Sequence, residues 1–122
     1  MLTAPSLSRG GLVQQFDLQQ KEARPILVTA WSRSENVSGK ADADYAIFVD
    51  ATCDDGSVMN ALNAPFAVGT HGWEQATLRI SPKAPIRVLR LHLIFRRHTG
   101  RVWFDDVLLR AAAAGRDEEE RP

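Results

Sequence analysis

Short runs of alternating apolar and polar residues, separated by turn-forming residues, make up most of this chain. An alternation with a period of two is typical of β-strands, because successive side chains point to opposite faces of a sheet. Turn chemistry such as Asp54-Asp55-Gly56 and Ser81-Pro82 separates the runs. The pattern predicts strands over residues 11–18, 26–33, 44–52, 58–66, 73–80, 86–96 and 101–110, and Pro65 confines the fourth to an edge strand or a loop.

In the runs that alternate most regularly, the apolar side chains share one face of the strand, and this face is expected to form the core. The segments between the runs are too short for the helix that links two parallel strands. The fold class predicted is therefore all-β, an antiparallel β-sandwich of two sheets. The expected core rows are Ile26, Val28 and Ala30; Tyr45, Ile47 and Val49; and Leu89, Leu91, Leu93 and Phe95.

A chain of 122 residues with 44% hydrophobic residues suits one domain. We assign residues 1–110 to the sandwich. Residues 111–122 are alanine-rich and then charged, and they are expected to form a disordered tail.

The last predicted strand reads Gly100-Arg101-Val102-Trp103-Phe104-Asp105-Asp106-Val107-Leu108-Leu109. It resembles the C-terminal strand of galactose-binding-like jelly-roll domains, in particular the carbohydrate-binding modules of glycoside hydrolases. Residues 11–15, 28–33, 44–56 and 69–73 follow the same pattern in the same order. The likeness covers residues 10–109 and implies a β-sandwich of jelly-roll type.

Members of that family usually begin with a further strand that has no counterpart in this chain. The resemblance therefore implies a sandwich lacking its first strand, whose edge another protein chain or domain completes. It also implies a structural calcium ion near Asp105 and Asp106, and calcium needs six or more oxygen ligands. The alternative is that one aspartate caps backbone amides at a strand edge. No other cofactor is expected.

The faces opposite the aliphatic rows carry aromatic rings beside planar polar groups. If these strands share a sheet, a sugar stacks on Trp31 and Phe48 while polar side chains bind its hydroxyls. Together with the resemblance, this predicts a non-catalytic, lectin-like carbohydrate-binding module. The alternative is that the aromatic residues pack under loops and the arginines form a solvated, ion-paired face. The predicted hydrogen-bonding residues are Arg33, Asp50, His92 and Arg96.

Other function classes have weaker support. No Gly-x-Ser-x-Gly elbow is present and the aspartates match turns and strand ends, so we expect no enzyme. Fifteen basic and fifteen acidic residues give a net charge of zero, which argues against nucleic acid as a partner. No apolar run approaches the ~20 residues that cross a membrane, so no membrane partner is expected. His71 and His98 fall in predicted turns, where a solvated imidazole is the usual outcome.

The second hypothesis is a structural or protein-interaction β-sandwich module within a larger assembly. It is favoured by the absence of a signal peptide, by the free Cys53 and by the shortened N-terminus. A carbohydrate-binding role would place the chain outside the cell, whereas the missing signal peptide leaves an intracellular location open.

Overall fold

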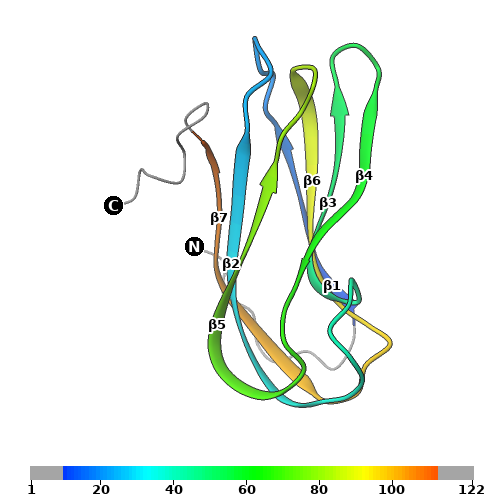
Figure 1. Cartoon of the computed structure of the whole chain (residues 1–122), viewed down its shortest axis with the longest axis vertical. Helices are drawn as coiled ribbons and strands as arrows, with labels where there is room; N and C mark the ends of the chain where they lie inside the picture. The colour runs from blue at the N-terminus through cyan, green and yellow to red at the C-terminus, as the bar shows by residue number, and fades with distance from the viewer. Residues whose placement is uncertain (1–9, 113–122) are drawn as a thin grey trace.

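The computed structural model describes residues 10–112, which form seven strands in two antiparallel sheets. One sheet has the order β1-β6-β3-β4 and the other the order β5-β2-β7, and the two lie face to face (Figure 1). The predicted all-β sandwich of two antiparallel sheets is thereby confirmed. The strands are β1 (Gly10–Asp17), β2 (Ile26–Val37), β3 (Tyr45–Cys53), β4 (Val58–Pro65), β5 (Gly69–Ile80), β6 (Ile86–Phe95) and β7 (Arg101–Ala111).

The strands are longer than predicted where two of them pair beyond their apolar runs. β2 continues to Val37 and β5 already begins at Gly69, because Ser34 pairs with His71 and Val37 with Gly69. The turn predicted to contain His71 is therefore part of a strand. β4 lies at a sheet edge, as Pro65 indicates. Within residues 10–112 no helix is long and apolar enough to span a membrane.

An aromatic cluster packs between the two sheets at the end of the sandwich where β3 begins and β6 ends. The ring of Tyr45 on β3 stacks on Phe66 with centroids 5.1 Å apart. It meets Phe95 and Phe104 edge-on at 5.6 Å and 6.2 Å. All four side chains are fully buried, and aliphatic residues of β2, β3 and β6 surround them. The predicted core rows thus do face inward, since alternation fixes which side chains a strand buries.

One polar contact links the two sheets inside this core. The hydroxyl groups of Ser32 on β2 and Tyr45 on β3 are hydrogen-bonded and buried. Burial raises the pKa of Tyr45 to about 12, although the hydrogen bond with Ser32 acts in the opposite direction. The phenol is therefore neutral at physiological pH, and each hydroxyl satisfies the other.

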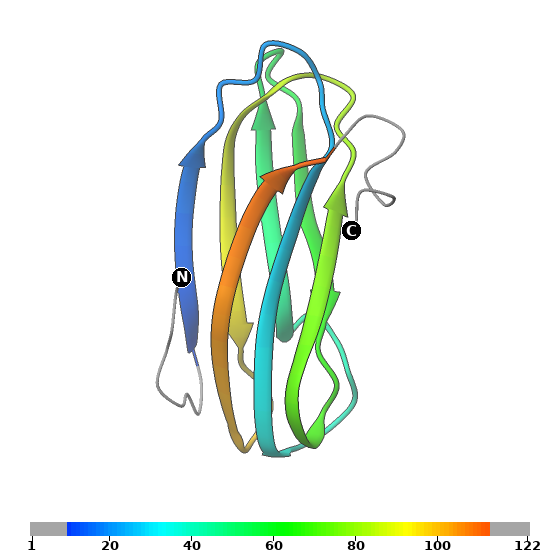
Figure 2. The ribbon, with the colours of Figure 1, turned by 90° about the vertical axis from the view of Figure 1, so that its left-hand side faces the viewer.

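The sandwich is open on one side, where β1 lies beyond β7 (Figure 2). β7 pairs with β2 alone and β1 with β6 alone among the described strands. Gln14 and Phe16 pair with the buried Leu91 and Leu89 and so point to the core side, yet Gln14 is exposed and Phe16 only half-buried. We call the unpaired edge of β7 and the adjacent core-facing side of β1 the open edge.

Residues 113–122 and 1–9 lie outside the described residues. The tail predicted over residues 111–122 is therefore described only at its start, where Ala111 ends β7 and Ala112 is buried. The backbone amide of Ala112 donates to the carbonyl of Pro25 at 2.9 Å, so the end of β7 is tied to the start of β2.

Candidate functional site

Five of the six residues predicted to form one ligand platform lie on two opposite faces of the sandwich, and the sixth lies in a loop. Trp31 and Arg33 belong to β2, whereas Phe48 and Asp50 on β3 and His92 on β6 belong to the other sheet. Arg96 follows β6 and pairs with Asp44 in a loop. A single platform requires β2, β3 and β6 to share one sheet. Because β2 lies in one sheet and β3 and β6 in the other, the predicted platform is not formed.

All three tryptophans of the chain lie on the outer face of the three-stranded sheet. On β2, Trp31 and Arg33 alternate with the buried Ser32 and Ser34 and therefore point outward. Trp103 pairs with Arg33, whose guanidinium carbon lies 4.1 Å from the centroid of the Trp103 ring. Trp73 on β5 is 47% exposed. We call Trp31, Arg33, Trp73 and Trp103 the tryptophan face.

A small hollow of about 260 Å³ lies next to Trp31 on this face. Its walls are apolar at Trp31 and at Leu108, which is 53% exposed. Gln75 and Asp106 place an amide and a carboxylate in its lining. The hollow thus offers a flat ring on one side and hydrogen-bonding groups on another. Thr29 and Val107 complete its lining.

The opposite face of the sandwich carries a polar groove of about 380 Å³, whose lining includes Gln15, Asp50, Asn60, Arg87 and Arg90. Arg90 Nε donates to Gln15 Oε1 at 3.2 Å. The carboxylate of Asp50 is partly engaged, because Oδ1 accepts the backbone amide of Ala61 at 2.9 Å. The groove is therefore lined by side chains of β1, β6 and β3 and by Asn60 on β4, and Gln15 and Arg90 in its lining are hydrogen-bonded to each other.

His92 lies on the same face as this polar groove. Its Nε2 atom is buried without a hydrogen-bond partner, and the nearest carboxylate oxygen, Asp50 Oδ2, is 3.9 Å away. The edge of Phe48 packs against the imidazole, with ring centroids 5.8 Å apart. The pairing of His92 with both Asp50 and Phe48 follows from the register of β3 and β6, in which Phe48 is directly opposite His92.

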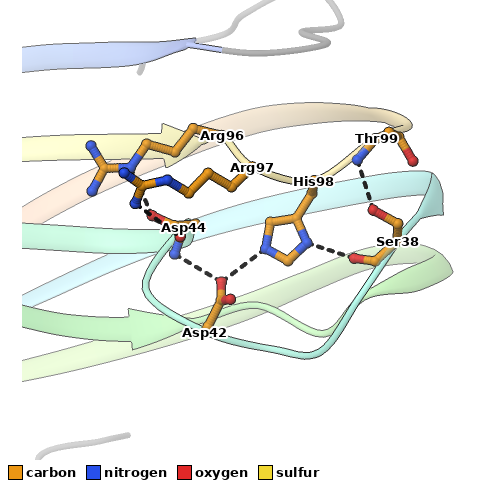
Figure 3. A network of polar contacts seen from close by, with 7 residues as sticks. All are labelled: Ser38, Asp42, Asp44, Arg96, Arg97, His98 and Thr99. Carbon is orange, nitrogen blue, oxygen red and sulfur yellow. Dashed lines mark hydrogen bonds and ion pairs between the residues drawn. The ribbon is translucent and has the colours of Figure 1, made fainter.

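Arg96 belongs to a network that ties the β2–β3 loop to the β6–β7 loop (Figure 3). Its Nε donates to Asp44 Oδ1 at 2.7 Å, and Arg97 lies 3.6 Å from the other oxygen of the same carboxylate. The ring of His98 lies between Ser38 and Asp42. Its Nδ1 atom donates to the Ser38 carbonyl, and its Nε2 atom donates to Asp42 Oδ1 at 2.8 Å. We call these residues the loop clamp.

The loop clamp favours the charged form of His98. Both ring nitrogens face acceptors, so both bonds exist together only when both nitrogens carry a proton. Burial acts against the charge, but the hydrogen bonds to Asp42 and Ser38 and the nearby carboxylates outweigh it and raise the pKa of His98. The bond from His98 and the backbone amide of Asp44 lower the pKa of Asp42. The expected solvated imidazole is wrong, because only 3% of this side chain is exposed.

Asp105 pairs with Trp31 on β2, and Asp106 follows it in a bulge of β7 beside the tryptophan face. Asp106 has a φ of 51°, and its backbone amide donates to Asp105 Oδ1 at 2.8 Å. No group of three or more His, Cys, Asp or Glu side chains able to hold a metal occurs among residues 10–112. Two neighbouring carboxylates fall short of the six or more oxygen ligands that calcium requires, so these residues do not fit the implied ion.

Comparison with known proteins relates part of this chain to very long nucleases. It is 33% identical over 85 residues to the tRNA3(Ser)-specific nuclease WapA of Bacillus spizizenii and to the tRNA(Glu)-specific nuclease WapA of Bacillus subtilis subsp. natto. The tRNA nuclease WapA of Bacillus subtilis strain 168 is also 33% identical over 85 residues. The matched segment is 69% of this chain and 4% of each relative. No family model matches the chain.

These relatives overturn three predictions made from the sequence. The prediction of a lectin-like carbohydrate-binding module is wrong, because the relatives are named tRNA nucleases. For the same reason the expectations of no enzyme and of no nucleic acid partner are wrong. The physical cause of the error is that exposed tryptophan and arginine side chains suit sugars, nucleobases and proteins alike.

Proposed function

We propose that this domain is a protein-interaction module of a long tRNA-nuclease polypeptide, packed against another part of that polypeptide at the open edge. The proposal takes up the second hypothesis drawn from the sequence. One observation carries it: among residues 10–112, β7 has a partner strand on one side only, and the core next to it is incompletely covered.

The order of the strands supports an interaction at this place. A jelly roll has eight strands in two sheets. The seven strands described here follow its order, β1-β6-β3-β4 and β5-β2-β7, with one position left beside β7. An added strand there would give both sheets four strands. The strand order agrees with the jelly-roll part of the resemblance, and the narrower galactose-binding-like class stays a prediction.

Partly covered apolar side chains at the open edge also support it. Phe16 on β1 and Val107 and Leu109 on β7 pack against the core but remain half-buried. An unpaired strand edge presents free backbone N–H and C=O groups, and natural proteins usually protect it. The edge of β4 has such protection in Pro65 and in the irregular backbone at Ala61, where φ is 58°. The open edge is therefore the better acceptor for a strand.

The relatives supply a source for such a strand. Because the matched segment is only 4% of their length, most of each relative lies outside the match. A domain with an open edge inside a polypeptide of that size can take an extended segment from a neighbouring region. We expect that segment to carry apolar residues at alternate positions, since one of its faces would cover Phe16.

Amide hydrogen exchange tests the proposal, with β4 as the matched control edge. The exchange of peptides from β7 and β4 is compared between the 122-residue chain alone and the chain within its longest expressible polypeptide. We expect exchange in Arg101–Ala111 to slow by roughly tenfold or more in the long form, while Val58–Pro65 stays unchanged. Equal exchange in β7 in both forms would overturn the proposal.

A further inference from the structure

The tryptophan face presents the side chains that single-stranded nucleic acids bind. Proteins hold single strands by stacking bases on aromatic rings and by placing cationic side chains along the backbone. Trp73 is 47% exposed and Trp31 half-buried, so both rings are accessible. The guanidinium of Arg33 lies 4.1 Å from the centroid of the Trp103 ring and adds a planar cation to the same face.

Arginines lie at both ends of this face. At one end Leu27 pairs with Arg79 on β5 and Arg110 on β7, so two guanidinium groups flank one apolar residue. Arg33 and Trp103 lie toward the other end, six residues along β2 from Leu27, which is about 20 Å of extended strand. Glu35, Asp105 and Asp106 offset part of this positive charge.

The hollow beside Trp31 suits one base. Its volume of about 260 Å³ is below the range of drug-sized ligand pockets, and its apolar wall is an indole ring. The amide of Gln75 and the carboxylate of Asp106 in its lining can bind the donor and acceptor groups on the edge of a base.

We propose that the tryptophan face binds single-stranded RNA, with bases stacked on Trp31 and Trp73 and phosphates held by Arg33, Arg79 and Arg110. This inference rests on the proposed function, which places the domain in a tRNA-nuclease polypeptide. It uses the outer face of the β5-β2-β7 sheet, whereas the open edge is the unpaired backbone edge of β7 with the core-facing side of β1, and Val107 lies where the two meet. Loss of strand pairing at β7 and loss of RNA binding are therefore separate outcomes of separate measurements.

The test is binding of a fluorescein-labelled single-stranded RNA of about 12 nucleotides to the 122-residue chain, followed by anisotropy and by tryptophan quenching. We expect Trp73→Ala and Trp31→Ala to weaken binding by roughly tenfold each, and Trp73→Phe to retain most of it. Val58→Ala removes an exposed apolar side chain from the other sheet and is the matched control. Binding should weaken between about 50 mM and about 200 mM salt.

Failure of binding, failure of the variant to weaken binding, and self-association through this face would each overturn the inference. The first is that the wild-type chain does not bind the RNA, and the second is that Trp73→Ala binds it as tightly as Val58→Ala does. The third is that light scattering shows self-association that Trp73→Ala removes, which would assign the face to a second copy of the chain. Circular dichroism confirms that each variant is folded before binding is compared.

Discussion

At the scale of single residues, the loop clamp shows how a histidine in a loop becomes structural. Both nitrogens of His98 face acceptors, and Gly39 leaves room for the ring, since a Cβ at that position would lie 3.3 Å from His98 Nδ1. Gly100 ends the β6–β7 loop, which also contains His98. It has a φ of 110°, and a Cβ there would lie 2.5 Å from the Asn36 carbonyl oxygen. Glycine is required at Gly100 because any side chain would collide with the backbone.

We predict that His98 makes folding stability depend on pH. Its raised pKa means that its contribution is fully present below its ordinary pKa of 6.5 and is lost as the pH rises through the raised value. The lowered pKa of Asp42 means that the contribution of Asp42 is present above 3.8 and is lost as the pH falls through the lowered value. The clamp therefore stabilises most between these two ordinary values.

Thermal unfolding from about pH 4 to about pH 9 measures this dependence. As the pH rises above neutrality, the unfolding temperature of the wild-type protein should fall more than that of His98→Gln, because the glutamine side chain carries no proton that can be lost. Val58→Ala is the control, since it changes an exposed side chain on the edge strand β4 and removes no titratable group. A wild-type and a His98→Gln profile of the same shape would contradict the prediction.

At the scale of elements, the contact between β2 and β3 shows how two sheets are held in one register. Ser32 and Tyr45 are the buried polar pair between the sheets, and the Tyr45 ring lies inside the aromatic cluster. The apolar cluster drives the sheets together, whereas the hydroxyl pair fixes how they meet, because each hydroxyl would otherwise be buried without a partner.

We predict that Tyr45→Phe lowers the free energy of unfolding by roughly 1–3 kcal/mol, because the Ser32 hydroxyl is left buried and unsatisfied. Ser32→Ala should cost a similar amount. The double variant should cost less than the sum, because both hydroxyl groups are then absent. Urea unfolding of the four proteins measures these values, and fully additive costs would show that the two hydroxyls do not act as a pair.

At the scale of the whole molecule, the two outer faces are separated by the core. The tryptophan face lies on the β5-β2-β7 sheet and the polar groove on the β1-β6-β3-β4 sheet, and packed sheets are about 10 Å apart. A change on one face therefore has no direct contact through which to affect the other.

We predict that Trp73→Ala and His92→Ala change the free energy of unfolding additively, within about 0.5 kcal/mol. His92→Ala and Asp50→Asn share one face, with 3.9 Å between their polar atoms, and should not be additive. Chemical unfolding of the single and double variants decides between these cases. Coupling between Trp73 and His92 as strong as that between His92 and Asp50 would refute the separation of the faces.

The sequence by itself determined the strands, their buried faces and the all-β class, because a period-two alternation is a local property of a strand. The rows of Ile26, Tyr45 and Leu89 predicted the core in this way. Pro65 likewise marked β4 as an edge strand, since proline cannot donate to a sheet.

Only the tertiary structure decided which outer faces share a surface. Alternation says that Trp31 and Phe48 both point outward, but it does not say which sheet each strand joins, and the topology puts them on opposite sides. The burial of His98 and the pairing of Arg96 with Asp44 also depend on two loops far apart in sequence meeting at one end of the sandwich. Long-range pairing fixes these contacts, and no local pattern carries that information.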